Sequence, residues 1–240
     1  MKNPFLSLIL PAHNEEQRLS NCLQNLAGFL QKQDYSSEIL VVENASSDRT
    51  LKVASGFAHR IKNLRIIHLE DRGKGLAVQT GMLAAEGEFR FFADVDFSMP
   101  VEEINRFFPP VVPKAQITIA SREAPGAVRY NEPAFRHFTG RVFNSLVRMS
   151  VVPGLQDTQC GFKCFRHDIA EQLFSRQTIT GWSFDAEILF IASKRKYKIL
   201  EIPIPWYFNP ESKVRLFNDS FQMAIDILTI HHNDQLGKYA

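Results

Sequence analysis

The amino-acid sequence predicts an α/β fold in which a mostly parallel, Rossmann-like sheet is flanked by helices within a single domain. Short apolar runs alternate with segments whose apolar residues recur at helical spacing. Strand–helix units of roughly 30 residues are typical of right-handed βαβ crossovers between parallel strands. The chain has 240 residues, of which 45% are hydrophobic, so it can bury a substantial core.

The first half of the chain follows this rhythm most regularly. An apolar run that stops at Pro11 predicts the first strand, and leucines at helical spacing from Leu19 to Leu30 predict the helix after it. The strands are expected at residues 5–10, 38–42, 64–69 and 89–93, and the helices at 15–30, from Thr50 and from Leu76. Ligands of such sheets bind beyond the carboxyl ends of the strands, where three polar loops are expected to meet.

The second half of the chain is less regular. A strand at 117–120 precedes a segment from Ala124 to Pro133 that contains proline and glycine, and we expect this segment to be an irregular lid. The remaining elements are expected as helices at 135–150, 184–194 and 217–230 and strands at 162–165 and 199–204.

The composition excludes several classes of protein. A formal net charge of +2 does not indicate a dedicated nucleic-acid-binding domain. The 3 cysteines form neither a disulfide framework nor a C-x-x-C pair, and their odd number indicates a reducing compartment. The apolar stretches fall short of the roughly 20 residues that span a bilayer. We expect a cytoplasmic protein with no signal peptide and no transmembrane helix.

Asp94 and Asp96 end the fourth predicted strand. Because side chains alternate along a strand, both carboxylates are expected on one side of the chain at the open edge of the sheet. Two hard oxygen donors suit Mg²⁺ or Mn²⁺ and leave positions open for a substrate diphosphate. A solvated strand end or a helix cap is the alternative for either residue alone.

Two further loops carry polar residues at strand ends. Asn14 and Glu15 can accept hydrogen bonds from a base or ribose, and the helix that follows them can face phosphate; the same residues can also act as a helix cap. Glu43 is a candidate for ribose or base contact. Ser46 to Asp48 fit chiefly a turn and helix cap, and for this loop ligand contact and a purely structural role carry equal weight.

A third loop, Arg72 to Gly75, offers a flexible backbone, a cation at Lys74 and the start of a helix. These features favour a phosphate or a nucleobase, although the string is not a Walker A motif and alone fits an ordinary loop.

Positive charge gathers in the second half of the chain. The basic residues concerned are Arg122, Arg129, Arg136, Arg141, Lys213 and Arg215. Together they can clamp a second phosphate. The alternatives are a solvated basic face and, because phenylalanines stand beside these arginines, contact with a membrane surface.

Two motifs near the C-terminus have open interpretations. The segment Asp157-Thr-Gln-Cys-Gly-Phe-Lys163 shows no mechanism through its spacing, and it fits a turn leading into a strand, with Cys160 as a small buried thiol. Trp182-Ser-Phe-Asp185 opens a helix, so Asp185 is either a partner of the helix dipole or a group that faces a substrate.

In this order the motifs resemble those of the family 2 inverting glycosyltransferases, and among them the dolichyl- and polyprenyl-phosphate sugar transferases. The resemblance covers nearly the whole chain. The motifs that carry it are Pro11-x-x-Asn14-Glu15, Val41-Val42-Glu43-Asn44-Ala-Ser-Ser-Asp48, Arg72-Gly-Lys74-Gly75, Asp94-Val95-Asp96, Ser121-Arg122, Asp157-Thr-Gln-Cys-Gly161-Phe-Lys163, Trp182-Ser-Phe-Asp185 and Ser212-Lys213-Val214.

The resemblance implies a GT-A fold and a role for each motif. Residues 1–122 would bind the nucleotide sugar, a UDP- or GDP-hexose, and residues 123–240 would face the acceptor. The residues implied in nucleotide-sugar binding are Pro11, His13, Asn14, Glu15, Glu43, Asn44, Asp48, Lys74, Gly75, Asp94 and Val95. The resemblance assigns Mg²⁺ or Mn²⁺ to Asp94 and Asp96, and the acceptor phosphate to Arg122, Arg136 and Lys213. Asp94, Asp96 and Arg122 are then the expected catalytic residues.

The implied acceptor is a polyprenyl phosphate, reached from the membrane surface. Its phosphate oxygen is already anionic near neutral pH, so it can attack the anomeric carbon without a strong base, and in-line displacement would invert the configuration. A soluble saccharide acceptor would instead need a carboxylate base, for which Asp157 and Asp185 are the candidates, and Trp182 and Asp185 are candidate sugar contacts. A catalytically idle nucleotide-sugar-binding module is the third hypothesis.

Overall fold

A seven-stranded mixed sheet forms the centre of the molecule. The computed structural model describes residues 3–133, 150–209 and 216–240, and in this part of the chain the strand order is β3-β2-β1-β4-β7-β5-β8. The strands are β1 (Leu6–Ala12), β2 (Ser37–Asn44), β3 (Leu64–Leu69), β4 (Phe89–Ala93), β5 (Ile117–Ser121), β7 (Phe162–Arg166) and β8 (Ile199–Pro203). All neighbours are parallel except β7, which runs antiparallel to both β4 and β5.

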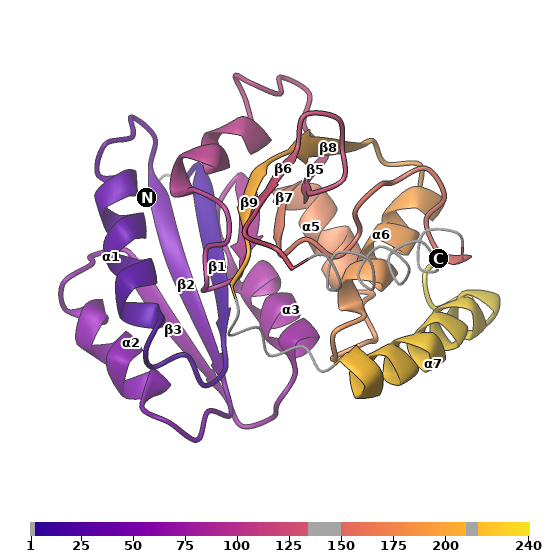
Figure 1. Cartoon of the computed structure of the whole chain (residues 1–240), viewed down its shortest axis with the longest axis horizontal. Coiled ribbons are helices and arrows are strands. Elements are labelled where there is room, and N and C mark those ends of the chain that lie inside the picture. The colour runs from indigo at the N-terminus through magenta and orange to yellow at the C-terminus, as the bar shows by residue number, and fades with distance from the viewer. Residues whose placement is uncertain (1–2, 134–149, 210–215) are drawn as a thin grey trace.

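Helices cover both faces of the sheet (Figure 1). One apolar layer lies under α1 (Leu19–Leu30), α2 (Thr50–Ala58) and the 3₁₀ helix η1 (Val101–Phe107). The opposite layer lies under α3 (Lys74–Ala84), α5 (His167–Phe174) and α6 (Phe184–Lys194). Alternate residues of β1 serve the two layers, because Leu8 and Leu10 join the first layer and Ile9 joins the second.

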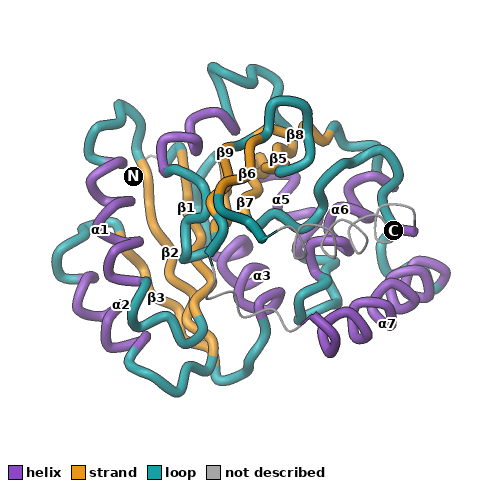
Figure 2. Tube along the Cα trace, in the orientation of Figure 1, coloured by secondary structure: helices purple, strands orange, loops and turns teal. Residues whose placement is uncertain are grey.

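The order of the strands predicts a ligand-binding crevice at the carboxyl end of β1. The chain winds outward from β1 to β2 and β3, then returns to β4 on the other side of β1, and this reversal is the point where open α/β sheets bind ligands. Figure 2 shows the strands between the helices and the loops that connect them. The register pairs Ala12 with Glu43, so the first two candidate loops begin side by side.

The predicted α/β class with one domain and a mostly parallel sheet is confirmed, but several details of the prediction were wrong. Helix α1 begins at Leu19 instead of residue 15, because a turn occupies residues 13–18 and Asn14 takes a left-handed φ of 54°. Helix α5 and the parallel ribbon of β6 (Val128–Tyr130) and β9 (Pro205–Tyr207) were not expected. Three-residue strands are too short to show an alternation of period two, so the sequence predicted an irregular segment at 124–133. The expected helix at 135–150 lies almost wholly outside the described residues.

The C-terminal helix α7 (Leu216–Gln235) leads to a buried anchor at Tyr239. The Tyr239 hydroxyl donates a hydrogen bond of 2.7 Å to the carboxylate of Glu187 in α6, which also accepts the backbone N–H groups of Thr178 and Ile179. No helix in the described ranges is both long and apolar enough to cross a membrane.

Replacing Tyr239 by Phe should lower the free energy of unfolding by about 1.5–3 kcal/mol, because the fully buried Glu187 carboxylate would lose a hydrogen-bond donor. Urea unfolding measures this change. Tyr207→Phe is the matched control, since that side chain is 46% exposed and its replacement should alter stability by less than about 0.5 kcal/mol. Equal effects of the two substitutions would contradict the proposed anchor.

Candidate functional site

Asp94 follows the last residue of β4 and lies against the β7 strand. Its backbone N–H donates to the carbonyl of Gly161, and its carboxylate packs directly on the Gly161 Cα. A Cβ at position 161 would lie 1.9 Å from Oδ2 of Asp94, so no other residue fits there without displacing the carboxylate. The side chain of Asp94 is 31% exposed and can therefore reach a ligand.

Lys74 is the first residue of helix α3, and its Nζ lies 2.6 Å from Oδ1 of Asp94. The same ammonium lies 5.1 Å from the centroid of the Trp182 ring. Burial acts to lower the pKa of Lys74, but the carboxylates of Asp94 and Asp185 outweigh it and hold the pKa above its usual value. The fold thus brings together three of the predicted site residues, from three separate segments.

The two carboxylates provide donors that suit a divalent cation. Burial and the neighbouring Asp94 charge raise the pKa of Asp96, so a cation that neutralised both groups would relieve their repulsion. Across the residues that the structure describes, no group of three or more His, Cys, Asp or Glu side chains is placed to hold a metal. Asp94 and Asp96 could hold such an ion together with a diphosphate and water.

The loop after β1 is fastened to the loop after β2. His13 Nδ1 lies 2.7 Å from the carbonyl oxygen of Asn44, and the Asn14 side-chain oxygen accepts the N–H of Ser47. Glu15 pairs with Arg18 through both carboxylate oxygens. The two loops therefore form one polar wall at the crevice.

Glu43 and Asn44, the last residues of β2, are almost fully buried. Burial acts to raise the pKa of Glu43, but hydrogen bonds from Ser46 and His68 outweigh it and hold the pKa below its usual value. The Asn44 amide donates to the carbonyl of Gly73, which ties this wall to the start of α3. Asp48 accepts the backbone N–H of Thr50, the first residue of α2, and the N-cap position itself is taken by Arg49.

Arg122 follows β5 and is fixed by a buried carboxylate. Its Nε and Nη2 lie 2.7 and 2.9 Å from the two oxygens of Asp157, whose side chain is 0% exposed. Burial acts to raise the pKa of Asp157, but the Arg122 charge and hydrogen bonds outweigh it and lower the pKa to about 2. Asp157 is therefore ionised and fully engaged, which disfavours it as a catalytic base.

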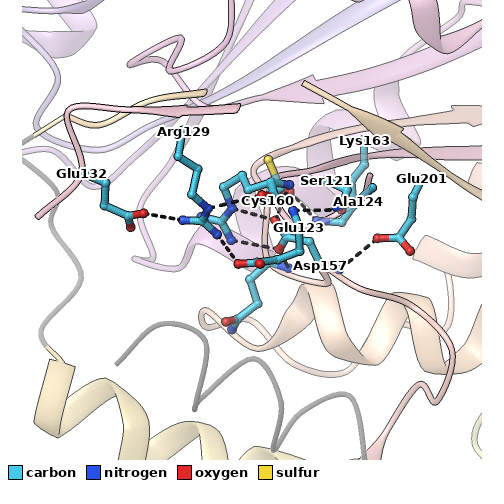
Figure 3. A network of polar contacts seen from close by, with 11 residues as sticks. Ser121, Glu123, Ala124, Arg129, Glu132, Asp157, Cys160, Lys163 and Glu201 are labelled. Atoms are coloured by element: carbon cyan, nitrogen blue, oxygen red, sulfur yellow. Dashed lines mark hydrogen bonds and ion pairs between the residues drawn. The ribbon is translucent and has the colours of Figure 1, made fainter. Parts of the chain in front are cut away.

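The support of Arg122 extends through β8 and β9. The carboxylate of Glu201 accepts the backbone N–H groups of Gln156 and Asp157 (Figure 3). The guanidinium groups of Arg122 and Arg129 lie 5.6 and 5.5 Å from the centroid of the Trp206 ring. One indole thus contacts two arginines, a geometry typical of cation–π pairs.

Asp185, at the start of α6, is also paired inside the protein. Its Oδ1 accepts a hydrogen bond of 2.7 Å from Lys163, whose side chain is 1% exposed. Burial raises the pKa of Asp185, and the charges of Lys163 and Lys74 only partly oppose this effect. Asp185 is closer than Asp157 to the properties of a base, but a buried ammonium occupies one of its oxygens.

The remaining predicted residues fall into three groups. Pro11 lies near the carboxyl end of β1, whereas Val95, two residues beyond the end of β4, is buried in the apolar layer. Gly75 packs against the 179–181 loop, where a Cβ would lie 2.7 Å from the carbonyl oxygen of Ile179. Arg136 and Lys213, predicted to bind the acceptor phosphate, lie outside the described residues.

The sequence did not predict that four further residues would support the site. They are Gly161, Lys163, Glu201 and Trp206. A signal for Lys163 was present, because a lysine in the middle of the apolar strand Phe162–Arg166 has to be buried with a partner. The contact between Gly161 and Asp94 had no such signal, since it depends on how two distant strands pair.

The comparison with protein families identifies the family of the chain. Residues 7–174 match the family model Glycosyl transferase family 2. The chain belongs to this family. It is therefore a nucleotide-sugar-dependent glycosyltransferase, as the motifs and their arrangement at the crevice indicated.

Curated relatives of this glycosyltransferase align over most of their length. The chain is 32% identical over 254 residues to the dolichyl-phosphate beta-glucosyltransferase of Dictyostelium discoideum, with 98% of this chain and 78% of the relative covered. It is 32% identical over 260 residues to the Saccharomyces cerevisiae protein of the same name, with coverage of 98% and 76%.

Solved structures confirm the GT-A fold of the glycosyltransferase. Glucosyl-3-phosphoglycerate synthase from Mycobacterium tuberculosis, solved with UDP, superimposes with a TM-score of 0.68 at 18% identity, over 95% of this chain and 80% of that one. A structure of the same synthase with Mn²⁺, UDP and its glucosylated product gives a TM-score of 0.67 at 16% identity, with the same coverage of the two chains.

The stability of the protein should depend on the Arg122–Asp157 pair in acid. Because folding lowers the pKa of Asp157 from 3.8 to about 2, its contribution is complete above pH 4 and is lost as the pH falls through 2. Between pH 5 and pH 2 the free energy of unfolding of the wild type should fall by about 2 kcal/mol through protonation of Asp157, and Asp157→Asn should not show this fall. Urea midpoints measured across this range test the difference. Asp34→Asn, an exposed control, should follow the wild type, and an equally steep loss in Asp157→Asn would contradict the assignment.

Proposed function

We propose that this glycosyltransferase moves a hexose from a UDP- or GDP-hexose to a polyprenyl phosphate, with inversion at the anomeric carbon. The relatives that align over three quarters of their length are named as glucosyltransferases acting on dolichyl phosphate, which favours glucose as the sugar and a lipid phosphate as the acceptor.

The observation that carries the proposal is the pairing of both candidate bases with cations of the protein. Asp157 is held by Arg122 and Asp185 by Lys163. A sugar hydroxyl must lose a proton as it attacks, whereas a phosphate monoester is already an anion near neutral pH because its second pKa is about 6. A site whose candidate bases are occupied is therefore better suited to a phosphate acceptor.

The donor would bind at the carboxyl ends of β1, β2 and β4. The wall formed by residues 11–15 and 43–48 would hold the nucleoside, and Lys74 at the start of α3 would face the diphosphate. Asp94 and Asp96 would hold Mg²⁺ or Mn²⁺. When bound, this ion would neutralise the diphosphate and stabilise it as a leaving group. Trp182, stacked beside Lys74, would face the sugar.

The acceptor phosphate would bind at Arg122. The guanidinium is oriented by Asp157 on one side and by the Trp206 ring on the other, so it enters the reaction with little freedom left to lose. Arg136 and Lys213 would complete the phosphate site.

The reaction needs no protein base. A phosphate oxygen attacks the anomeric carbon on the side opposite the diphosphate, the bond from that carbon to the diphosphate oxygen breaks, and the nucleoside diphosphate leaves with the electron pair. An α-linked donor gives a β-linked glycosyl phosphate. The task of the protein is alignment and charge neutralisation.

The acceptor would reach the site from a membrane surface on which the protein rests. The β6–β9 ribbon, whose Trp206 supports Arg122, exposes the stacked rings of Tyr130 and Tyr207, with centroids 4.6 Å apart. Tyrosines are enriched at the level of lipid headgroups. This ribbon would therefore contact the membrane on its cytoplasmic face, beside the entrance for the lipid phosphate.

Incubation with UDP-glucose or GDP-mannose, a short-chain prenyl phosphate and Mn²⁺ should release nucleoside diphosphate and form a glycosyl phosphate lipid. Asp96→Asn should reduce the rate at least about 1,000-fold, because several kcal/mol of charge stabilisation would be lost. Asp34→Asn is the exposed control and should keep full activity. If the protein binds the donor but turns over with none of the prenyl phosphates, the result would instead support an idle binding module.

Arg122→Lys should reduce kcat/KM for the prenyl phosphate on the order of 100-fold and leave the KM for the donor within about threefold, since Lys cannot keep the two-pronged contact with Asp157. Steady-state kinetics with each substrate varied measures both effects. Arg106→Lys, in η1, is the control, because the Arg106 guanidinium pairs with Glu103 and not with Asp157. Equal losses for donor and acceptor, or transfer to a soluble saccharide that disappears in Asp185→Asn, would contradict the acceptor assignment.

A further inference from the structure

The segment from Asp157 to Lys163 contacts both halves of the proposed reaction site. At one end Asp157 fixes Arg122, and its backbone N–H is held by Glu201 of β8. Near the other end Gly161 is in close contact with the carboxylate of Asp94. Seven consecutive residues thus connect the group proposed to bind the acceptor to a group proposed to bind the metal.

Two contacts with Gly161 fix the position of Asp94. Its carbonyl accepts the N–H of Asp94 at 3.1 Å, and its Cα supplies the surface on which the carboxylate rests. Position 161 precedes the first residue of β7, where Phe162 pairs with Ala93 of β4. The carboxylate therefore depends on the exact path of the backbone at residues 160–161.

Lys163 holds that backbone. Its side chain is 1% exposed, and its ammonium donates to the carbonyl oxygen of Cys160 at 2.6 Å and to Asp185 at 2.7 Å. The same ammonium lies 5.3 Å from the centroid of the Phe92 ring, on the neighbouring strand β4. A buried charge costs several kcal/mol unless it is paired, and apolar residues of similar size often stabilise a fold as well as a buried ion pair does. Lys163 therefore contributes geometry more than stability.

We propose that Gly161 and Lys163 are positioning residues that orient the Asp94 carboxylate for the divalent cation. The hydrogen bond from Lys163 fixes the position of the Cys160 carbonyl. That carbonyl determines the backbone path at Gly161, and the backbone at Gly161 determines the position of the Asp94 carboxylate. The proposal rests on the proposed function, because it assumes that Asp94 binds a metal together with a nucleoside diphosphate. Neither residue touches substrate.

Gly161→Ala is the direct test. The added methyl group would displace the Asp94 carboxylate, so the dissociation constant for Mn²⁺ in the presence of UDP should rise 10- to 100-fold, the range found when groups supporting a metal ligand are removed. The electron paramagnetic resonance signal of unbound Mn²⁺ measures this constant, and a parallel series uses GDP. Gly28→Ala is the matched control, since a Cβ at that position meets nothing within 4 Å.

Lys163→Met separates positioning from electrostatics. Loss of a positive charge near a cation site should by charge alone strengthen Mn²⁺ binding. Positioning predicts the opposite, about a tenfold weaker binding. The double variant Lys163→Met/Asp185→Asn removes one buried charge of each sign and should fold even where the single variant does not. Its Mn²⁺ affinity should be weakened to a similar degree.

The outcomes separate this proposal from the proposed function. Weaker Mn²⁺ binding in Gly161→Ala and in the Lys163 variants, with melting temperatures near that of Gly28→Ala for at least one of them, would support it. Unchanged or tighter Mn²⁺ binding, in a wild type that binds Mn²⁺ with UDP or GDP, would overturn the positioning role and leave the proposed function intact. A wild type that binds no Mn²⁺ with either nucleotide would overturn both.

Discussion

The antiparallel insertion of β7 between β4 and β5 is the constraint on which the site depends. The register that pairs Phe162 with Ala93 puts Gly161 against Asp94, and the same strand places Lys163 opposite Phe92 and Ile119. The segment before β7 returns to the end of β5, where Asp157 meets Arg122. A parallel sheet alone would gather the donor-side loops after β1, β2 and β4. The reversed strand adds the contacts that connect those loops to the second half of the chain.

Two cation–carboxylate pairs then shape the chemistry. Lys163 and Asp185 are both buried, whereas Asp157 is buried and its partner Arg122 is 21% exposed. Burying a charge is costly, and such pairs rarely stabilise a fold more than apolar packing does. Both pairs occupy carboxylates that would otherwise be candidate bases. A site of this kind is suited to a nucleophile that arrives already ionised, so the acceptor proposed here and the pairing of both candidate bases are two aspects of one arrangement.

The sequence predicted the donor side of the site better than its supports. Asp94 and Lys74 were predicted from local patterns, because strand ends and helix starts in a doubly wound sheet converge at one edge. Trp182, which lies beside Lys74, was named only through the resemblance to the family. Gly161 and Trp206 were missed because their roles come from pairing between distant strands, which leaves no periodicity in the sequence. Asp157 was read as a possible base because spacing does not reveal that both of its oxygens contact Arg122. The late start of α1 was missed because Asn14, near the start of the turn at residues 13–18, takes a left-handed conformation in which it contacts the β2 loop.

The central claim is that the acceptor supplies its own negative charge, and the pH dependence of kcat/KM for the acceptor tests it most directly. The profile should be measured for a prenyl phosphate and for the matching prenyl phosphonate, whose second pKa is higher. The account predicts that the acidic limb of the profile follows the ionisation of the acceptor, near pH 6 for the phosphate and at higher pH for the phosphonate. An acidic limb that stays at the same pH for both acceptors would show that a group of the protein is the base, and it would contradict the account.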